Sequence, residues 1–166
     1  MNEIAGNIVK RSDKVAYIGV EVSGAETFMR MQGFTALTPT KNPAEYTRQY
    51  VDEEFERSEV VRYKPEIAYG FDLFTPNSAQ QPIVDVHDGE KLGSDTYVYI
   101  VVVDYSKEPQ GGAYPATKRQ WAIVPSGEAD GTDAYTYSGK FAAQGALISG
   151  TAEVDANQMT ATFAEA

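Results

Sequence analysis

The chain has 166 residues and a formal net charge of −10, and 42% of its residues are hydrophobic. This composition predicts one folded domain, residues 1–166, and the excess of acid excludes a protein that coats nucleic acid through Lys and Arg. Because cysteine is absent, disulfides, thiolate catalysis and thiolate metal sites are excluded. No apolar run approaches the roughly 20 residues of a membrane span, and the N-terminus lacks the apolar core of a signal peptide. We therefore expect a protein that is made in the cytoplasm and stays there or leaves in a particle.

Met1–Asp13 is polar and weakly patterned, which predicts an N-terminal arm. Lys14–Val22 alternates apolar and other residues and predicts a strand. Ser23-Gly24 is a turn signal, and Phe28–Phe34 alternates well enough to be the return strand. The chain is thus expected to begin with an arm followed by a hairpin.

Thr35–Glu59 has two prolines, many charges and only scattered apolar residues. Loops longer than about 12–15 residues are uncommon in compact domains and tend to be functional or disordered. The aromatic residues argue against disorder. We therefore expect an extended loop or hairpin, residues 38–59, that packs on something outside its own domain. Its expected contact residues are Tyr46, Arg48, Tyr50, Asp52, Glu53, Phe55 and Arg57.

Lys64–Phe74 has the pattern of an amphipathic strand, with one apolar face and one small or acidic face that carries Glu66 and Asp72. After a polar break, Pro82–His87 predicts a short helix, because proline suits the first helical position and Gly89 is a plausible stop.

Thr96–Tyr105 is a run of β-branched and aromatic residues that is apolar on both faces, so this strand requires cover on both sides. Thr117–Val124 predicts the next strand, and Tyr135–Gln144, Leu147–Val154 and Met159–Phe163 predict three more. With eight or nine strands and one short helix, the chain is expected to be mainly β (α+β), a β-sandwich or barrel.

Candidate catalytic and metal-binding patterns are weak. His87 is the only histidine, no serine lies in a GxSxG motif, and Gly111-Gly112 is not followed by the Lys-Ser/Thr of a phosphate loop. The carboxylates of the acidic run 52–56 could serve a glycosidase or bind Ca²⁺, but ion pairs with neighbours explain them better. The turn containing Glu128, Asp130 and Asp133 could also hold Ca²⁺, but an ordinary Asp-Gly turn explains it better. We expect no enzyme and no cofactor, with His87 in a structural role and Trp121 in the core or at its rim.

Three stretches in order are MQGFTALTPTKNPAEYTRQYVDEEFE from Met31 to Glu56, then YKPEIAYGFDLF, then VPSGEADGTDAYTYSGKF. They resemble the major tail tube protein of long-tailed bacteriophages with non-contractile, siphophage-type tails. The most specific part is GFTALTPTKNPAEYTRQYVDE, and the likeness extends from about Gly19 to Phe163.

The resemblance implies a structural virion protein with a β-sandwich tail tube fold and a flanking helix. Six subunits would close into a ring whose inner sheets form one β-barrel, and rings would stack helically into the tube through which DNA is ejected. It also implies partners: further copies of this chain, a tape measure protein, and tail terminator or distal tail proteins. The protein would be located in the virion tail after assembly in the host cytoplasm, without membrane insertion.

A channel lining is expected from the wet strand faces, because an acidic or small-residue lumen keeps DNA mobile. The expected lumen-facing residues are Glu66, Asp72, Thr136, Ser138, Lys140 and Gln144, where Lys140 could pair with an acid on the next strand. The alternative for these faces is contact with outside solvent. The arm Met1–Asp13 and the tail after Phe163 are expected to become ordered only in the tube.

Two other classes remain open from the sequence. One is a carbohydrate-binding β-sandwich, as an adhesin or a virion decoration module, which would need aromatic side chains exposed together on one sheet face. The other is a small jelly-roll enzyme, which would need a convergent polar pocket.

Overall fold

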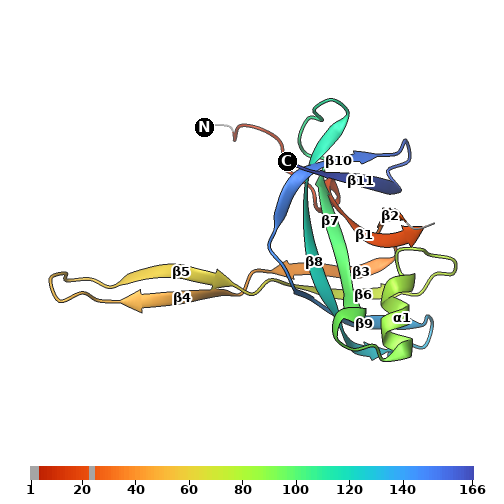
Figure 1. The fold of residues 1–166 in the computed structure, drawn as a ribbon, viewed down its shortest axis with the longest axis horizontal. Helices are drawn as coiled ribbons and strands as arrows, with labels where there is room; N and C mark the ends of the chain where they lie inside the picture. Colours follow the sequence, from red (N-terminus) through yellow and green to blue (C-terminus); the bar gives the residue numbers. More distant parts are fainter. Residues whose placement is uncertain (1–3, 23–24) are drawn as a thin grey trace.

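The computed structural model describes residues 4–22 and 25–166 (Figure 1). This part of the chain contains eleven strands, one α-helix and two short 3-10 helices, which confirms a mainly β chain with one short helix. The expected turn at Ser23-Gly24 lies outside the described residues. The elements are η1 Arg11–Asp13, β1 Lys14–Val22, β2 Ala25–Arg30, β3 Phe34–Thr40, β4 Pro43–Arg48, β5 Arg57–Tyr63, β6 Glu66–Asp72, α1 Gln81–Gly89, η2 Gly93–Thr96, β7 Tyr97–Asp104, β8 Ala113–Glu128, β9 Thr136–Ala143, β10 Ile148–Val154 and β11 Thr160–Glu165.

Six strands form a closed barrel. They follow the order β10-β11-β2-β1-β7-β8, and β8 pairs back onto β10 through Ala113–Lys118. All of these pairs are antiparallel. Closure of this kind joins the two ends of the six-stranded barrel, and the open edges of the sheet lie outside it.

The long strand β8 takes part in both the closed barrel and an open sheet. Its first half closes the barrel, and its second half, Trp121–Glu128, pairs with β9 and continues into an open sheet of order β8-β9-β6-β3. On its other edge β8 pairs with β7 only as far as Ala122. Along 123–128, therefore, β8 has β9 on one edge and no described strand on the other.

The strand β7 has cover on both faces, as its sequence predicted. Val101 and Val103 are fully buried inside the barrel, together with Tyr17, Phe28, Ala116, Ala152 and Ala161. Ile100 faces the other way, into a second core between α1 and the open sheet. That second core also contains Trp121 and the apolar face of β6, namely Ile67, Tyr69 and Phe71.

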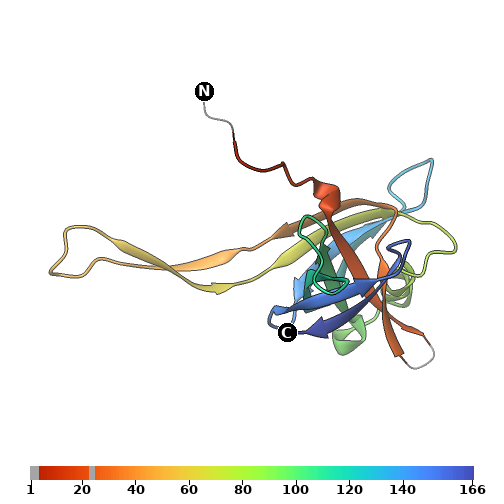
Figure 2. The same ribbon diagram turned by 90° about the horizontal axis from the view of Figure 1, so that it is seen from above.

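The strands β4 and β5 form a separate two-stranded hairpin. In both views it extends away from the rest of the molecule, and the N-terminal arm leaves the body in another direction (Figures 1 and 2). No helix in the described part of the chain is long and apolar enough to cross a membrane.

Several sequence predictions were wrong in detail. The return strand β2 ends at Arg30, and Phe34 instead begins β3, because Gly33 adopts a positive φ of 81° between them. The tail after Phe163 is already ordered in the single chain, since Ala164 and Glu165 are paired with β10. Part of the arm is also fixed, because the Arg11 guanidinium donates to the Leu37 carbonyl on β3 at 2.9 Å.

Candidate assembly and channel surfaces

The hairpin buries almost none of its own surface. Every residue of β5 is exposed, and in β4 only Ala44 is partly covered. Tyr50 is 52% exposed, Phe55 is 69% exposed and Val51 is fully exposed at the tip. An isolated two-stranded hairpin is marginally stable in water, so cover by another surface would stabilise this one.

Two of the three arginines of the hairpin, Arg48 and Arg57, are engaged locally. Arg57 donates twice to the Glu53 carboxylate, at 2.6 and 2.7 Å. Arg48 bonds the Tyr46 hydroxyl, and its guanidinium lies 5.2 Å from the centre of that ring. Among the described residues, no cation lies within ion-pairing distance of the remaining tip carboxylates, which are Asp52, Glu54 and Glu56. The tip is therefore apolar and negative.

Most of the residues expected to line a channel lie together on one face. In the β6–β9 ladder Asp72 is opposite Thr136, Gly70 opposite Ser138 and Ala68 opposite Lys140. Directly opposed residues point to the same side of a sheet, so the two rows form one small, polar surface. Gln144 follows the end of β9 and is exposed. Whether this surface faces a lumen stays a prediction.

Lys140 and Glu66 form an ion pair on that surface, with 3.0 Å between Nζ and Oε1. This is a pairing that the sequence suggested for Lys140. The pair is partly exposed, so it contributes little to stability, but it neutralises the only cation in the two rows.

Behind this face lies a buried polar network centred on His87. The Tyr69 hydroxyl and His87 Nε2 are 2.6 Å apart, and Glu128 Oε1 lies 3.7 Å from Nδ1. Burial lowers the pKa of His87, although Glu128 opposes this effect. Burial and the hydrogen bond to Asp88 raise the pKa of Tyr137 to about 12. The lowered pKa favours the neutral form of His87, which links α1 to β6 through the Tyr69 hydroxyl.

The acidic loop after β8 makes internal hydrogen bonds. Tyr135 donates to Glu128 at 3.1 Å, and Thr136 donates to Asp130 at 2.6 Å. Nowhere in residues 4–22 and 25–166 do three or more His, Asp or Glu side chains gather as a metal site. These carboxylates therefore hold a turn between β8 and β9.

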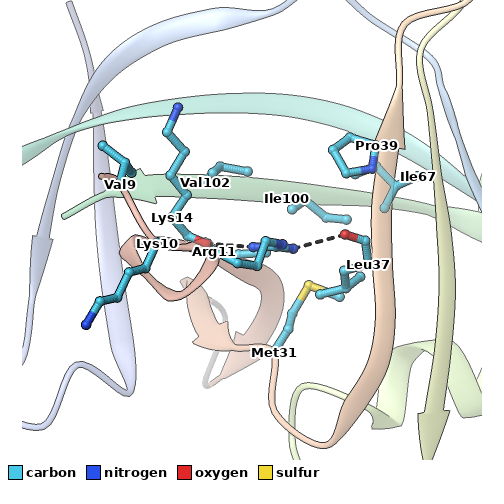
Figure 3. Close-up of a pocket in the computed structure, with 11 residues that line it drawn as sticks. Val9, Lys10, Arg11, Lys14, Met31, Leu37, Pro39, Ile67, Ile100 and Val102 are labelled. Atoms are coloured by element: carbon cyan, nitrogen blue, oxygen red, sulfur yellow. Dashed lines mark hydrogen bonds between the residues drawn. The ribbon is translucent and has the colours of Figure 1, made fainter. Parts of the chain in front are cut away.

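A pocket of about 450 Å³ opens between the arm and the open sheet (Figure 3). The Arg11 side chain crosses it from η1 to β3, donating to the carbonyls of Lys14 and Leu37 at 3.0 and 2.9 Å. The floor is apolar and the arm side is basic. The lining residues are Val9, Lys10, Arg11, Lys14, Ala16, Met31, Leu37, Pro39, Ile67, Ile100 and Val102.

Sequence reasoning missed this pocket. Its walls come from the arm, β1, β3, β6, β7 and the residue after β2, which are distant in sequence. The only local signal was the basic character of Lys10, Arg11 and Lys14 in an acidic chain.

No protein-family profile and no curated protein sequence matches the chain. Solved structures share its fold. A chain from the tail of an empty gene transfer agent particle, refined with helical C6 symmetry, has a TM-score of 0.57 and 12% identity, covering 84% of this chain and 97% of its own length. A chain from the virion of a native gene transfer agent particle has a TM-score of 0.53 and 12% identity, and the match again covers 84% of this chain and 97% of that chain. A chain from the sixfold-symmetrised baseplate of the anti-feeding prophage has a TM-score of 0.51 and 7% identity, and the match covers 88% of this chain and 97% of that chain.

Proposed function

We propose that this protein is a structural subunit of a phage-type tail tube, in which six copies form a ring and rings stack into a conduit for DNA. The observation that carries the proposal is the shared fold, over 84% of the chain, with a chain of a C6-symmetric tail. The sequence resemblance to siphophage-type tail tube proteins supports the non-contractile form of this tube.

The hairpin supports a role in assembly. Its strands are exposed on both faces, and its apolar tip residues have no cover from their own chain. Obligate interfaces bury aromatic anchors of this kind and use them as hot spots. Tyr46, Tyr50 and Phe55 are the proposed anchors against a neighbouring subunit.

The polar face of β6 and β9 supports a role as channel lining. A lumen that passes DNA must not hold the phosphates, and a surface of small residues with acids and one neutralised lysine meets that requirement. In this proposal the tube is part of a virion assembled in the host cytoplasm. A tape measure protein would occupy the tube, and terminator and distal tail proteins would cap it.

The exposed aromatics do not favour the carbohydrate-binding alternative. Four of the exposed aromatic residues, Tyr46, Tyr50, Phe55 and Tyr63, lie on the hairpin, and Phe74, Tyr97 and Tyr135 lie in different segments of the body, whereas the polar sheet face carries small residues. A structural role rather than an enzymatic one is therefore the function that we propose.

Electron microscopy of the purified full-length protein at high concentration tests the proposal. We expect sixfold rings or tubes with a central channel. A protein that stays monomeric at every concentration and salt condition would refute it.

A hairpin deletion provides the second arm of the test. The Lys64 amide donates to the Lys41 carbonyl at 3.2 Å, so a two-glycine link can replace residues 43–63 without moving the sheet. We expect this variant to remain folded by circular dichroism and to form no tubes. Normal tubes from the deletion variant would exclude the hairpin from assembly.

A further inference from the structure

We propose that the pocket between the arm and the open sheet is the receptor for the hairpin tip of a second copy of this chain. The inference rests on the proposed self-assembly and identifies the two surfaces that meet.

The first observation is reach. At about 3.3 Å per residue, the strand between Thr40 and Tyr50 carries the tip roughly 33 Å from the sheet edge. Both views show the hairpin extended away from the body (Figures 1 and 2). The tip therefore cannot occupy its own pocket, and any docking joins two chains.

The second observation is the match of apolar surfaces. The pocket floor is formed by aliphatic side chains, among them Leu37, Ile67 and Ile100, and its volume of about 450 Å³ lies in the range of pockets that enclose a ligand group. The tip offers Phe55 and Val51, both largely exposed. An aromatic anchor in such a pocket is the usual form of an interface hot spot.

The third observation is charge. The tip carries three carboxylates without an ion-pair partner in the described chain, Asp52, Glu54 and Glu56. The pocket rim carries Lys10, Arg11 and Lys14, and Arg30 lies in the adjoining hollow. Two acids lie beside this rim: Asp13, which accepts from the Lys10 amide, and Asp104, which is opposite Lys14 and whose pKa is lowered mainly by Ser106 and also by Lys14.

The balance at the rim is thus positive in a chain whose net charge is −10. A negative tip and a positive rim attract each other, and two tips or two rims repel. The charges favour a head-to-tail contact over a symmetric one. Head-to-tail contacts of this kind propagate, which suits rings or stacked rings.

Cross-linking tests the contact directly, because the wild-type chain contains no cysteine. Two full-length single-cysteine variants, Val51→Cys at the tip and Val9→Cys at the rim, are mixed and treated with a short bifunctional maleimide. The matched control replaces Val9→Cys with Leu92→Cys, a highly exposed position after α1. We expect at least tenfold more heterodimer from the Val51/Val9 pair than from the control pair.

Equal yields from the two pairs would overturn the inference, whether or not tubes form. Cross-linking of Val9→Cys chains mainly to one another would also overturn it, because the pockets would then face each other. Tubes with equal yields would leave the proposed function standing without this contact. Absence of any assembly, including cross-linked dimers, would refute both.

Charge reversal provides an independent measurement. Glu54→Lys with Glu56→Lys, or Lys10→Glu with Lys14→Glu, should each raise the concentration needed for assembly by roughly tenfold or more at low salt. All four changes in one chain should restore assembly toward the wild-type concentration. Lys91→Glu with Glu108→Lys, neither of which lines the pocket or lies on the hairpin, is the control and should change little. Failure of the combined variant to recover would contradict the pairing.

Discussion

Substitution of Gly139 by alanine should destabilise the subunit strongly, because the space beside this residue is occupied. Gly139 lies on the core side of β9 and pairs with Tyr69 on β6. A Cβ atom there would approach the Val124 carbonyl oxygen to 2.4 Å and the Tyr69 hydroxyl to 2.7 Å. Real Cβ atoms do not make such contacts with backbone, so β8 or β9 must move.

The magnitude has two parts. Overpacking of this kind costs about 1–3 kcal/mol. Displacement of the Tyr69 hydroxyl from His87 Nε2, now 2.6 Å away, leaves buried polar groups unsatisfied and adds about 1–3 kcal/mol. The expected loss in the free energy of unfolding is therefore roughly 2–6 kcal/mol, or a fall in Tm of roughly 4–24 °C for a domain of this size.

Urea unfolding of the unassembled chain measures the effect through the midpoint and the m value. Gly127→Ala is the matched control, because a Cβ there meets only the Ser138 hydroxyl at an ordinary 3.7 Å. In a double-mutant cycle, Tyr69→Phe should cost less in the Gly139→Ala background than in the wild type. Equal midpoints for the two glycine variants would refute the reasoning.

Two further predictions concern pH and charge. Burial lowers the pKa of His87 in the folded chain, so the unfolded chain binds the proton at a higher pH. The free energy of unfolding should therefore fall as pH drops below about 6.5, by at most about 1.4 kcal/mol per pH unit. His87→Gln should flatten that part of the urea-midpoint profile, and an unchanged slope would exclude His87 as its source. The double variant Glu66→Lys with Asp72→Lys should form intact tubes that retain DNA at low salt and release it as the salt concentration rises. If its tubes look normal and DNA is ejected at a rate that does not depend on salt, these residues do not line the channel.

The strands were predictable where the two-residue alternation of side chains, or a run of β-branched and aromatic residues, dominates the sequence. Alternation assigned the core and wet faces of β6, and a run that is apolar on both sides predicted the doubly covered β7. The full length of β8 was not predictable, because Pro115 and Pro125 read as loop residues. Both are tolerated because β7 pairs with β8 only between Ala116 and Ala122, which leaves a free edge beside each proline.

Pairing between distant strands was equally hidden. Nothing in the local sequence pattern shows that β8 pairs with β10, since that pairing depends on tertiary contacts between two separate segments. For the candidate surfaces, alternation was enough to group Glu66, Asp72 and Lys140. The pocket was not predictable, because residues from six separate segments form its walls and none of them is unusual alone.

The split course of β8 has a consequence for strand addition. Closure of the barrel leaves two long open edges in the described sheet: β3, and β8 along 123–128. Each carries a proline, Pro39 or Pro125, and the second also carries a register shift between Pro125 and Gly127. Missing donors and irregular strands obstruct indiscriminate strand addition. At these two edges, strand addition is therefore limited to a partner strand whose shape matches the interruption.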